Sequence, residues 1–298
     1  MAAVKTSKRN TPKPNSNRAQ KLAERAAERG AVAVARPFEG LAFECDLVAM
    51  REFVPSATAQ LPLREASRPV FVATVLPGAV AALVRENDGA ATGYVGVQVQ
   101  LSAGSLPHDL GAAVVWAGTA AAGESLQVAP EGGPSLVDVV ETGVALDISV
   151  HNNFNWWIPQ GVAPTPEVAA TVERANSAIM PSARLTSVAA AWWVDAGEKA
   201  HIRWVRPESE DDLMLALARL HAAGELHLGD GSRFAGSFRT HGLLVPVFDL
   251  DPQRDAASWE ESTAAFGKRL DEALAVDTPL TGDERRARNG LIGRQVTL

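Results

Sequence analysis

Short β-rich runs alternate with helix-like segments along most of this chain of 298 residues. In residues 93–101, valine alternates with small or polar residues, as expected of a strand with one buried face. No apolar run approaches the roughly 20 residues that cross a bilayer. The alternation predicts an α+β fold with mainly antiparallel sheets. The β-rich runs are residues 58–63, 70–76, 93–101, 185–194, 199–205, 233–239 and 243–250.

The predicted helices carry apolar residues at helical spacing and recognisable start signals. Thr165-Pro166-Glu167 combines an N-cap, a proline at the first helical position and an acidic first turn. Ser258 with Glu261, and Thr281 with Glu284, have the spacing of a capping box. We therefore expect helices near residues 46–53, 108–121, 165–179 and 209–222, and two C-terminal helices that begin at Ser258 and Thr281.

Two local signals describe the last pair of predicted strands. His241-Gly242 separates residues 233–239 from 243–250 and predicts a hairpin. Pro246 lacks a backbone N–H, so it predicts an edge strand or a bulge.

The body of the chain divides into two similar halves. FVPSATAQL (53–61) resembles IMPSARLTS (179–187), and each follows a helix and opens a strand. We interpret residues 36–125 and 144–298 as two related α-β-β-β-α halves, joined by a Gly/Pro-rich connection at 126–143. The C-terminal helices belong to the second half. Chance similarity in an alanine-rich chain is the alternative explanation.

A basic tail, residues 1–35, precedes the body. Residues 1–31 carry eight basic and two acidic residues, a net charge of +6, whereas the remaining 20 basic and 33 acidic residues give the rest −13. The first 16 residues are too polar to fold alone, and residues 17–30 favour a marginal helix. We expect the tail to contact RNA or the ribosome; a solubilising linker is the alternative. The candidate contacts are Lys5, Lys8, Arg9, Lys13, Arg18, Lys21, Arg25 and Arg29.

Cysteine use and the N-terminal sequence indicate the compartment. Cys45 is the sole cysteine, so the chain has no internal disulfide and no thiolate metal cage. The basic N-terminus is not followed by the apolar region and cleavage site of a secretory signal. We expect a cytoplasmic protein without a membrane segment.

No stretch of the sequence carries a catalytic signature. G-x-S-x-G, Walker, H-E-x-x-H and C-x-x-C motifs are absent. No catalytic, cofactor-binding or metal-binding residue is therefore predicted. His221 and His227 with Asp230 form a minor alternative as a metal site. The polar cluster around His151, which leads into a strand expected to hold Trp156 and Trp157, is the best candidate for a small-ligand pocket.

The tryptophans suggest a binding surface. Neighbours in a strand point to opposite faces, so one member of each of the pairs 156–157 and 192–193 should enter the core. The other is covered by a second layer or exposed for a partner protein or a stacked base. The candidate surface consists of His151, Trp157, Trp193 and Trp204.

From Arg36 onward, the chain resembles an actinobacterial family of uncharacterised proteins. The similarity lies in residues 36–58, 165–181, 212–250 and 280–298. The resemblance implies no activity and no catalytic residues. Some members begin with a SEC-C zinc motif, a segment associated with ribosome contact, but residues 1–35 contain no cysteine. Zinc binding is therefore not implied here.

These features together favour a non-enzymatic interaction protein whose basic tail contacts RNA or the ribosome and whose body binds a protein partner. One alternative is a small-ligand binder or enzyme with a pocket near residues 151–157. Another is a scaffold that self-associates through exposed tryptophans.

Overall fold

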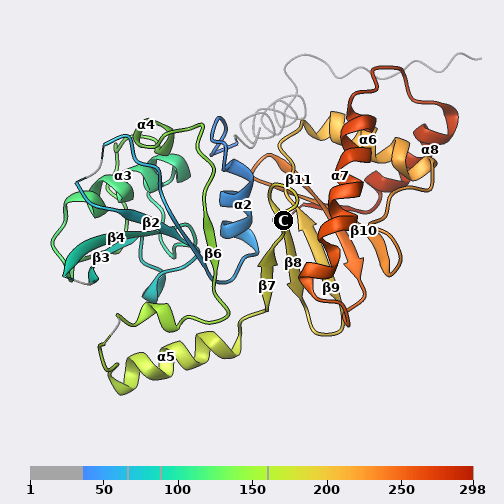
Figure 1. The fold of residues 1–298 in the computed structure, drawn as a ribbon. Coiled ribbons are helices and arrows are strands. Elements are labelled where there is room, and N and C mark those ends of the chain that lie inside the picture. The colour runs from blue at the N-terminus through green and yellow to red at the C-terminus, as the bar shows by residue number, and fades with distance from the viewer. Residues whose placement is uncertain (1–35, 66, 88, 160, 298) are drawn as a thin grey trace, which may run out of the picture. The chain divides into compact units, whose positions relative to one another are not determined.

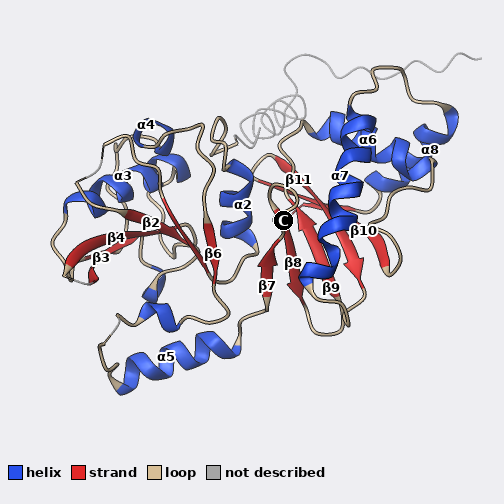
Figure 2. Cartoon of the chain, viewed as in Figure 1, coloured by secondary structure: helices blue, strands red, loops and turns tan. Residues whose placement is uncertain are grey.

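A computed structural model describes residues 36–297 apart from 66, 88 and 160. The predicted tail and its eight basic residues lie outside this part. Pro37–Leu298 form one compact unit, in which seven helices accompany two six-stranded sheets that are mostly antiparallel (Figures 1 and 2). The predicted α+β class is confirmed. Of the helices described, none has both the length and the apolar character needed to span a membrane.

The first sheet has the strand order β5-β3-β4-β2-β1-β6, in which only β2 and β4 run parallel. Helix α3 packs on β2, β3 and β4, and α4 packs on α3. The elements of this half are α2 (Glu44–Glu52), β1 (Ala57–Gln60), β2 (Val70–Ala73), η1 (Pro77–Ala79), β3 (Ala82–Asn87), β4 (Ala90–Gly96), α3 (Leu106–Thr119), β5 (Ser125–Leu126), α4 (Leu136–Val139) and β6 (Ile148–Val150).

The second sheet has the order β12-β10-β11-β9-β8-β7, and only its edge strand β12 runs parallel to a neighbour. Helices α6 and α7 share a buried core with one face of this sheet, and α8 packs on α6. The elements are η2 (Asn155–Trp157), α5 (Pro166–Ser177), β7 (Ser182–Arg184), β8 (Ala191–Asp195), β9 (Ala200–Trp204), α6 (Glu210–Ala222), β10 (Ser232–Thr240), β11 (Leu243–Leu250), η3 (Ala256–Trp259), α7 (Glu260–Leu274), α8 (Gly282–Ile292) and β12 (Gln295–Thr297).

Helix α2 packs against both sheets. Four consecutive residues, Leu47 to Met50, are fully buried. Their core includes Val72 of the first sheet and Trp192 and Val245 of the second. Apolar residues at helical spacing predict one buried side on this helix. The helix has a second buried side, because the second sheet covers the side that a single sheet would leave in water.

An ion pair ties α2 to the second sheet. Arg184 of β7 donates from Nε and Nη2 to the two carboxylate oxygens of Asp46, each at 2.9 Å. The Asp46 side chain is 9% exposed and that of Arg184 is 24% exposed. Two parallel hydrogen bonds between planar groups fix both distance and orientation. The pair therefore sets the position of β7 beside α2.

Several local predictions are confirmed. The hairpin turns at His241-Gly242, with positive φ angles of 47° and 75° that suit a two-residue hairpin loop. Thr165 caps α5 through the Val168 N–H, and Thr281 with Glu284 forms a capping box on α8.

Other predictions are wrong. Residues 185–190 are not a strand, because Thr186 and Ser187 donate their N–H groups to the Glu260 carboxylate and not to a neighbouring strand; β8 begins at Ala191. Asp255 rather than Ser258 caps the helical turn that leads into α7, because its carboxylate accepts from the Ser258 N–H. Pro246 lies in an interior strand and not at an edge. The predicted alternative, a bulge, lies beside it: the register of β10 shifts between Phe234 and Gly236, opposite Val247.

The two halves share part of their topology. The order β1-β2-β4-β3 in the first sheet corresponds to β8-β9-β11-β10 in the second. The central pair is parallel in the first sheet and antiparallel in the second, where α6 connects β9 to β10. Four strands separate α2 from α3, and three separate α5 from α6, so only the second half has the predicted α-β-β-β-α order. A common origin of the halves stays a prediction.

The connection at 126–143 is packed against α3. A Cβ on Gly111 would lie 2.3 Å from the Pro134 carbonyl oxygen, and a Cβ on Gly133 would lie 2.4 Å from the Ala112 Cβ. Such distances are too short for any side chain, so these glycines let the connection touch the helix backbone. The chain passes from the first sheet to the second later, between β6 and β7.

We expect Gly111→Ala to destabilise the protein by about 2 kcal/mol, because the new methyl group must push the 134–136 backbone away from α3. Gly118→Ala is the matched control in the same helix, since a Cβ there meets nothing within 4 Å. It should stabilise by up to about 1 kcal/mol through helix propensity. Urea unfolding measures both. Equal stability of the Gly111 variant and the wild type would contradict the close packing.

Candidate functional site

The predicted region around His151 forms a cluster of aromatic rings over the first sheet. The ring centroids of His151 and Trp156 are 5.5 Å apart, and those of Tyr94 and Trp156 are 6.4 Å apart. Phe71 and Tyr94 stack at 5.6 Å on the parallel strands β2 and β4. Arg85 lies 5.4 Å from the centroid of the Tyr94 ring and donates to the Trp156 carbonyl. The structure thus brings His151 and Trp156 together with three residues that the sequence did not indicate.

The polar atoms of this aromatic cluster are engaged within it. The Trp156 indole N–H donates to Ser56 Oγ at 2.9 Å, and His151 Nε2 lies 2.8 Å from Thr58 Oγ1. Burial lowers the pKa of His151 below its ordinary value. Trp156 and Trp157 lie on the helical turn η2 and not on the predicted strand, because Asn153 Oδ1 accepts from the Asn155 N–H and starts a turn. The cluster covers the sheet and offers few unused groups to a ligand.

The other two predicted surface tryptophans have different positions. Trp204 is 2% exposed and donates from its indole N–H to the Ala189 carbonyl, so its assignment to a binding surface is wrong. Trp192 enters the core beside α2, as expected of one member of the pair. Trp193 points to the opposite face and is half-buried against the core under α6 and α7. Helices α6 and α7 cover one face of β8, and helix α2 covers the other.

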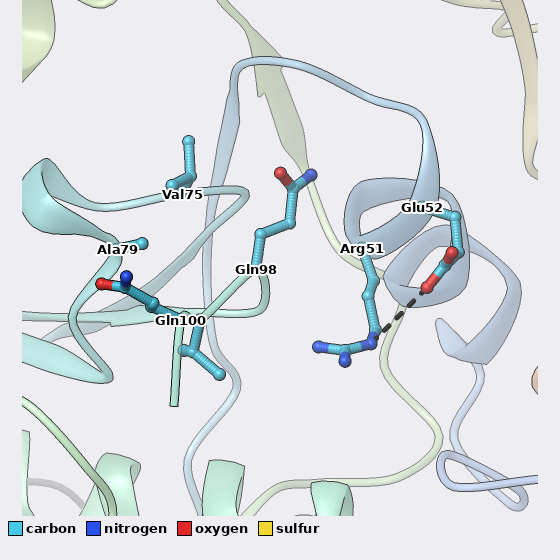
Figure 3. Close-up of a pocket in the computed structure, with 7 residues that line it drawn as sticks. Arg51, Glu52, Val75, Ala79, Gln98 and Gln100 are labelled. Atoms are coloured by element: carbon cyan, nitrogen blue, oxygen red, sulfur yellow. Dashed lines mark ion pairs between the residues drawn. The ribbon is translucent and has the colours of Figure 1, made fainter. Parts of the chain in front are cut away.

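A cleft of about 480 Å³ opens beside the C-terminal end of α2. Figure 3 shows Arg51 and Glu52 on one side and Val75, Ala79, Gln98 and Gln100 facing them. The volume falls within the range of small-molecule sites. The lining comes from three segments: the last turn of α2, the turn between β2 and η1, and the segment after β4. Its members are Arg51, Glu52, Val75, Ala79, Gln98, Val99 and Gln100.

Hydrogen bonds fix the walls of this Arg51 cleft. Gln98 Nε2 donates to the carbonyls of Met50 at 2.6 Å and Val54 at 3.1 Å, so it caps the open C-terminal end of α2. The Gln100 N–H donates to the Ala79 carbonyl at 3.0 Å. Trp157 donates from its indole N–H to the Val75 carbonyl at 3.1 Å. The predicted residue Trp157 therefore supports one wall of the cleft from outside.

One residue that lines the cleft, Ala79, has a left-handed backbone without being glycine, with φ of 51°. His241, whose φ of 47° belongs to the hairpin turn, contacts Glu52. Residues of this kind cost about 1 kcal/mol each and persist where the surroundings hold them. They are concentrated at ligand sites in proteins generally, which favours the cleft as a functional site.

Glu52 in the lining of the cleft lies closer to one of its two basic neighbours than to the other. Glu52 Oε1 lies 2.7 Å from His241 Nε2 and 3.5 Å from Arg51 Nε. The hydrogen bond from His241 is the main reason that the pKa of Glu52 lies below its ordinary value, with the charges of His241 and Arg51 adding to it and burial opposing it. Glu52 is therefore held as a carboxylate, mainly by His241.

A second cavity, of about 650 Å³, lies between α3, α4 and residues 63–65. Its arginine, Arg64, donates to the carbonyls of Val140 and Val137 and so holds the backbone in place. The floor includes the aliphatic residues Leu63 and Val114. We rank the Arg51 cleft above this larger cavity because the Arg51 guanidinium makes one hydrogen bond to the backbone, whereas that of Arg64 makes two.

The remaining predicted positions do not extend the site. Gly229 donates its N–H to His227 Nδ1, which occupies that ring nitrogen in a turn. Within the described part of the chain, no three His, Cys, Asp or Glu residues are grouped to hold a metal ion. Cys45 is half-buried on α2.

Comparison with known proteins identifies the family and no function. Residues 37–298 match the model of a family of unknown function, DUF5926. No curated protein and no solved structure gives a match. The resemblance of the body to an uncharacterised family is confirmed. The actinobacterial source and the relation to SEC-C proteins stay predictions.

The lowered pKa of Glu52 predicts an acid-dependent contribution to stability. The unfolded carboxylate protonates near 4.5, and the folded one at a lower pH, so the contribution is complete above pH 4.5 and is lost as the pH falls through the folded pKa. We expect Glu52→Gln to be less stable than the wild type at neutral pH and the difference to shrink below pH 4.5. Urea unfolding across this range tests it. A difference that grows as the pH falls below 4.5 would contradict the assignment.

Proposed function

This chain belongs to DUF5926, a family of unknown function, and we propose that its body is a binding protein that holds a small polar ligand in the Arg51 cleft. The observation that carries the proposal is a guanidinium, 26% exposed, that faces the cleft with donors left over. Gln100 lines the cleft beside it and supplies further hydrogen-bonding groups, whereas Nε2 of Gln98 is engaged with the carbonyls of Met50 and Val54. Concave sites with a few convergent polar groups are the usual places for small ligands.

The lining favours binding over catalysis. Its seven residues include no serine, cysteine, threonine, lysine, tyrosine or histidine, and Glu52, whose carboxylate is the remaining type of nucleophile, is engaged with His241. Glu52 has its pKa shifted downwards, whereas a general base at neutral pH benefits from a pKa near 7. We therefore propose that the ligand is bound and released without being chemically altered.

Filling the cleft should abolish ligand binding. Gln100 is exposed and lines the cleft, so Gln100→Trp places a large ring there without disturbing the core. In a thermal-shift screen of the full chain against small polar metabolites, we expect compounds that stabilise the wild type and fail to stabilise this variant. Gln127→Trp is the control, because Gln127 is also exposed and lies outside the lining. A screen without stabilising compounds, or with compounds that stabilise all three proteins equally, would refute the proposal.

A second candidate function is contact with RNA or the ribosome through the basic tail. The charge distribution favours it: residues 1–31 carry +6 and the rest of the chain −13. Basic segments bind phosphate backbones by releasing counterions, whereas an acidic body is repelled by them. Contact would then be limited to the tail. We also propose a cytoplasmic location, where RNA is abundant and the single cysteine stays reduced. Self-association through the tryptophans has less support, because Trp204 is buried.

Neutralising the tail should release the protein from ribosomes. We expect the wild type to travel with ribosomes in lysate gradients at low salt and to leave them at high salt. A full-length variant with glutamine at Lys5, Lys8, Arg9, Lys13, Arg18, Lys21, Arg25 and Arg29 should stay at the top of the gradient. If the wild type also stays at the top, the RNA proposal fails while ligand binding by the body is unaffected.

A further inference from the structure

One carboxylate oxygen in the cleft is shared between two basic side chains. Glu52 Oε1 lies at hydrogen-bond distance from His241 Nε2, 2.7 Å, and at 3.5 Å from Arg51 Nε. The longer distance gives an ion pair without a good hydrogen bond. Glu52 is therefore committed to His241, and Arg51 is only loosely paired.

Arg51 keeps most of its donors unused. One Nη1 bond goes to the Val97 carbonyl. Nε is buried and has no hydrogen-bond partner, and no bond from Nη2 is formed within the described part of the chain. The buried Nε is closed to a ligand, but Nη2 and the second N–H of Nη1 remain, and two N–H groups at the end of a planar guanidinium are suited to two-point contact with a carboxylate or a phosphate. Figure 3 shows it extending between Glu52 and the segment that carries Gln98 and Gln100.

His241 is held where it can restrain Glu52. It occupies the two-residue turn between β10 and β11, where its backbone is fixed in the left-handed region. The same hairpin contacts the end of α2, since the rings of Phe53 and Phe238 meet edge to face with centroids 6.2 Å apart. The turn of the second sheet therefore positions a side chain of α2 at the cleft.

On the basis of the proposed function, we infer that the ligand presents an anionic group, carboxylate or phosphate, to Arg51, and that His241 acts as a positioning residue that keeps Glu52 from occupying Arg51. Without His241, the Glu52 carboxylate is free to turn toward the guanidinium and compete with the ligand. With His241 in place, the competing carboxylate is restrained and Arg51 is available.

Three substitutions test the inference in the full chain. His241→Asn keeps a residue that tolerates the left-handed backbone but is too short to hold Glu52. Glu52→Gln removes the competing charge, and Arg51→Gln removes the anion contact. The probes are inorganic phosphate and acetate, titrated by calorimetry at constant ionic strength. Thermal unfolding of each variant confirms that it is folded.

We expect His241→Asn to weaken binding of the better probe about fivefold, the effect of one partly exposed charge pair. Glu52→Gln alone should not weaken it, because His241 already restrains the carboxylate that this substitution removes. His241→Asn should have no effect in the Glu52→Gln background, because no carboxylate is left to restrain. Arg51→Gln should abolish binding. The probe that binds more tightly identifies the anion as carboxylate or phosphate.

Two results distinguish a failure of the role of His241 from a failure of the anionic ligand class. If Arg51→Gln abolishes binding while His241→Asn changes nothing, or changes it equally in both backgrounds, the role of His241 is overturned and the cleft remains a ligand site. If neither anion binds the wild type, the anionic class is overturned. The Gln100→Trp screen then decides the proposed function independently, because it covers uncharged compounds.

Discussion

Burial of α2 against both sheets is the constraint on which the rest of the structure depends. A nine-residue helix has little stability alone, so tertiary packing must supply it. Burial on both sides also restricts where its charged residues can go. The residue Asp46 as a whole is 6% exposed, and Arg184 compensates its charge. Removing the arginine alone would leave a buried negative charge, at a cost of about 3 kcal/mol. Arg51 and Glu52 are displaced to the last turn, where the cleft begins.

The end of a buried helix creates polar groups that need partners. The last carbonyls of an α-helix lack intrahelical donors, and at α2 the side chain of Gln98 supplies two hydrogen bonds to carbonyls of this region. These two hydrogen bonds hold the segment after β4 against the helix, and this segment forms one wall of the cleft. The wall opposite Arg51 includes the strained Ala79. The cleft thus follows from how the helix ends, and the strained backbone beside it indicates that its shape is maintained.

The sequence predicted what depends on local patterns. The His241-Gly242 turn and the Thr281 capping box each act within a few residues, and each corresponds to an observed element. Of the alternating residues 93–101, only the first part belongs to a strand, because β4 ends at Gly96. Prediction from the sequence failed where contacts between distant segments determine the structure. The burial of Trp204 depends on the layer above its strand, and the cleft collects Arg51, Ala79 and Gln98 from three separate segments. None of these residues belongs to a motif, so no pattern marked them; Trp157, which was predicted, borders the cleft only through one hydrogen bond.

The two proposals concern anions of different kinds, and the charge distribution explains why one chain would need two modes of binding. A tail of +6 can bind a polyanion through long-range attraction and needs no fixed geometry. A body of −13 repels anions at a distance, so a small anion can be held there only by short-range contacts that exceed this repulsion. A partly buried guanidinium satisfies that condition better than an exposed lysine, because its donors are oriented and poorly hydrated. Its availability then depends on the nearest carboxylate, Glu52, which is why the hairpin histidine that restrains it becomes the residue that sets affinity.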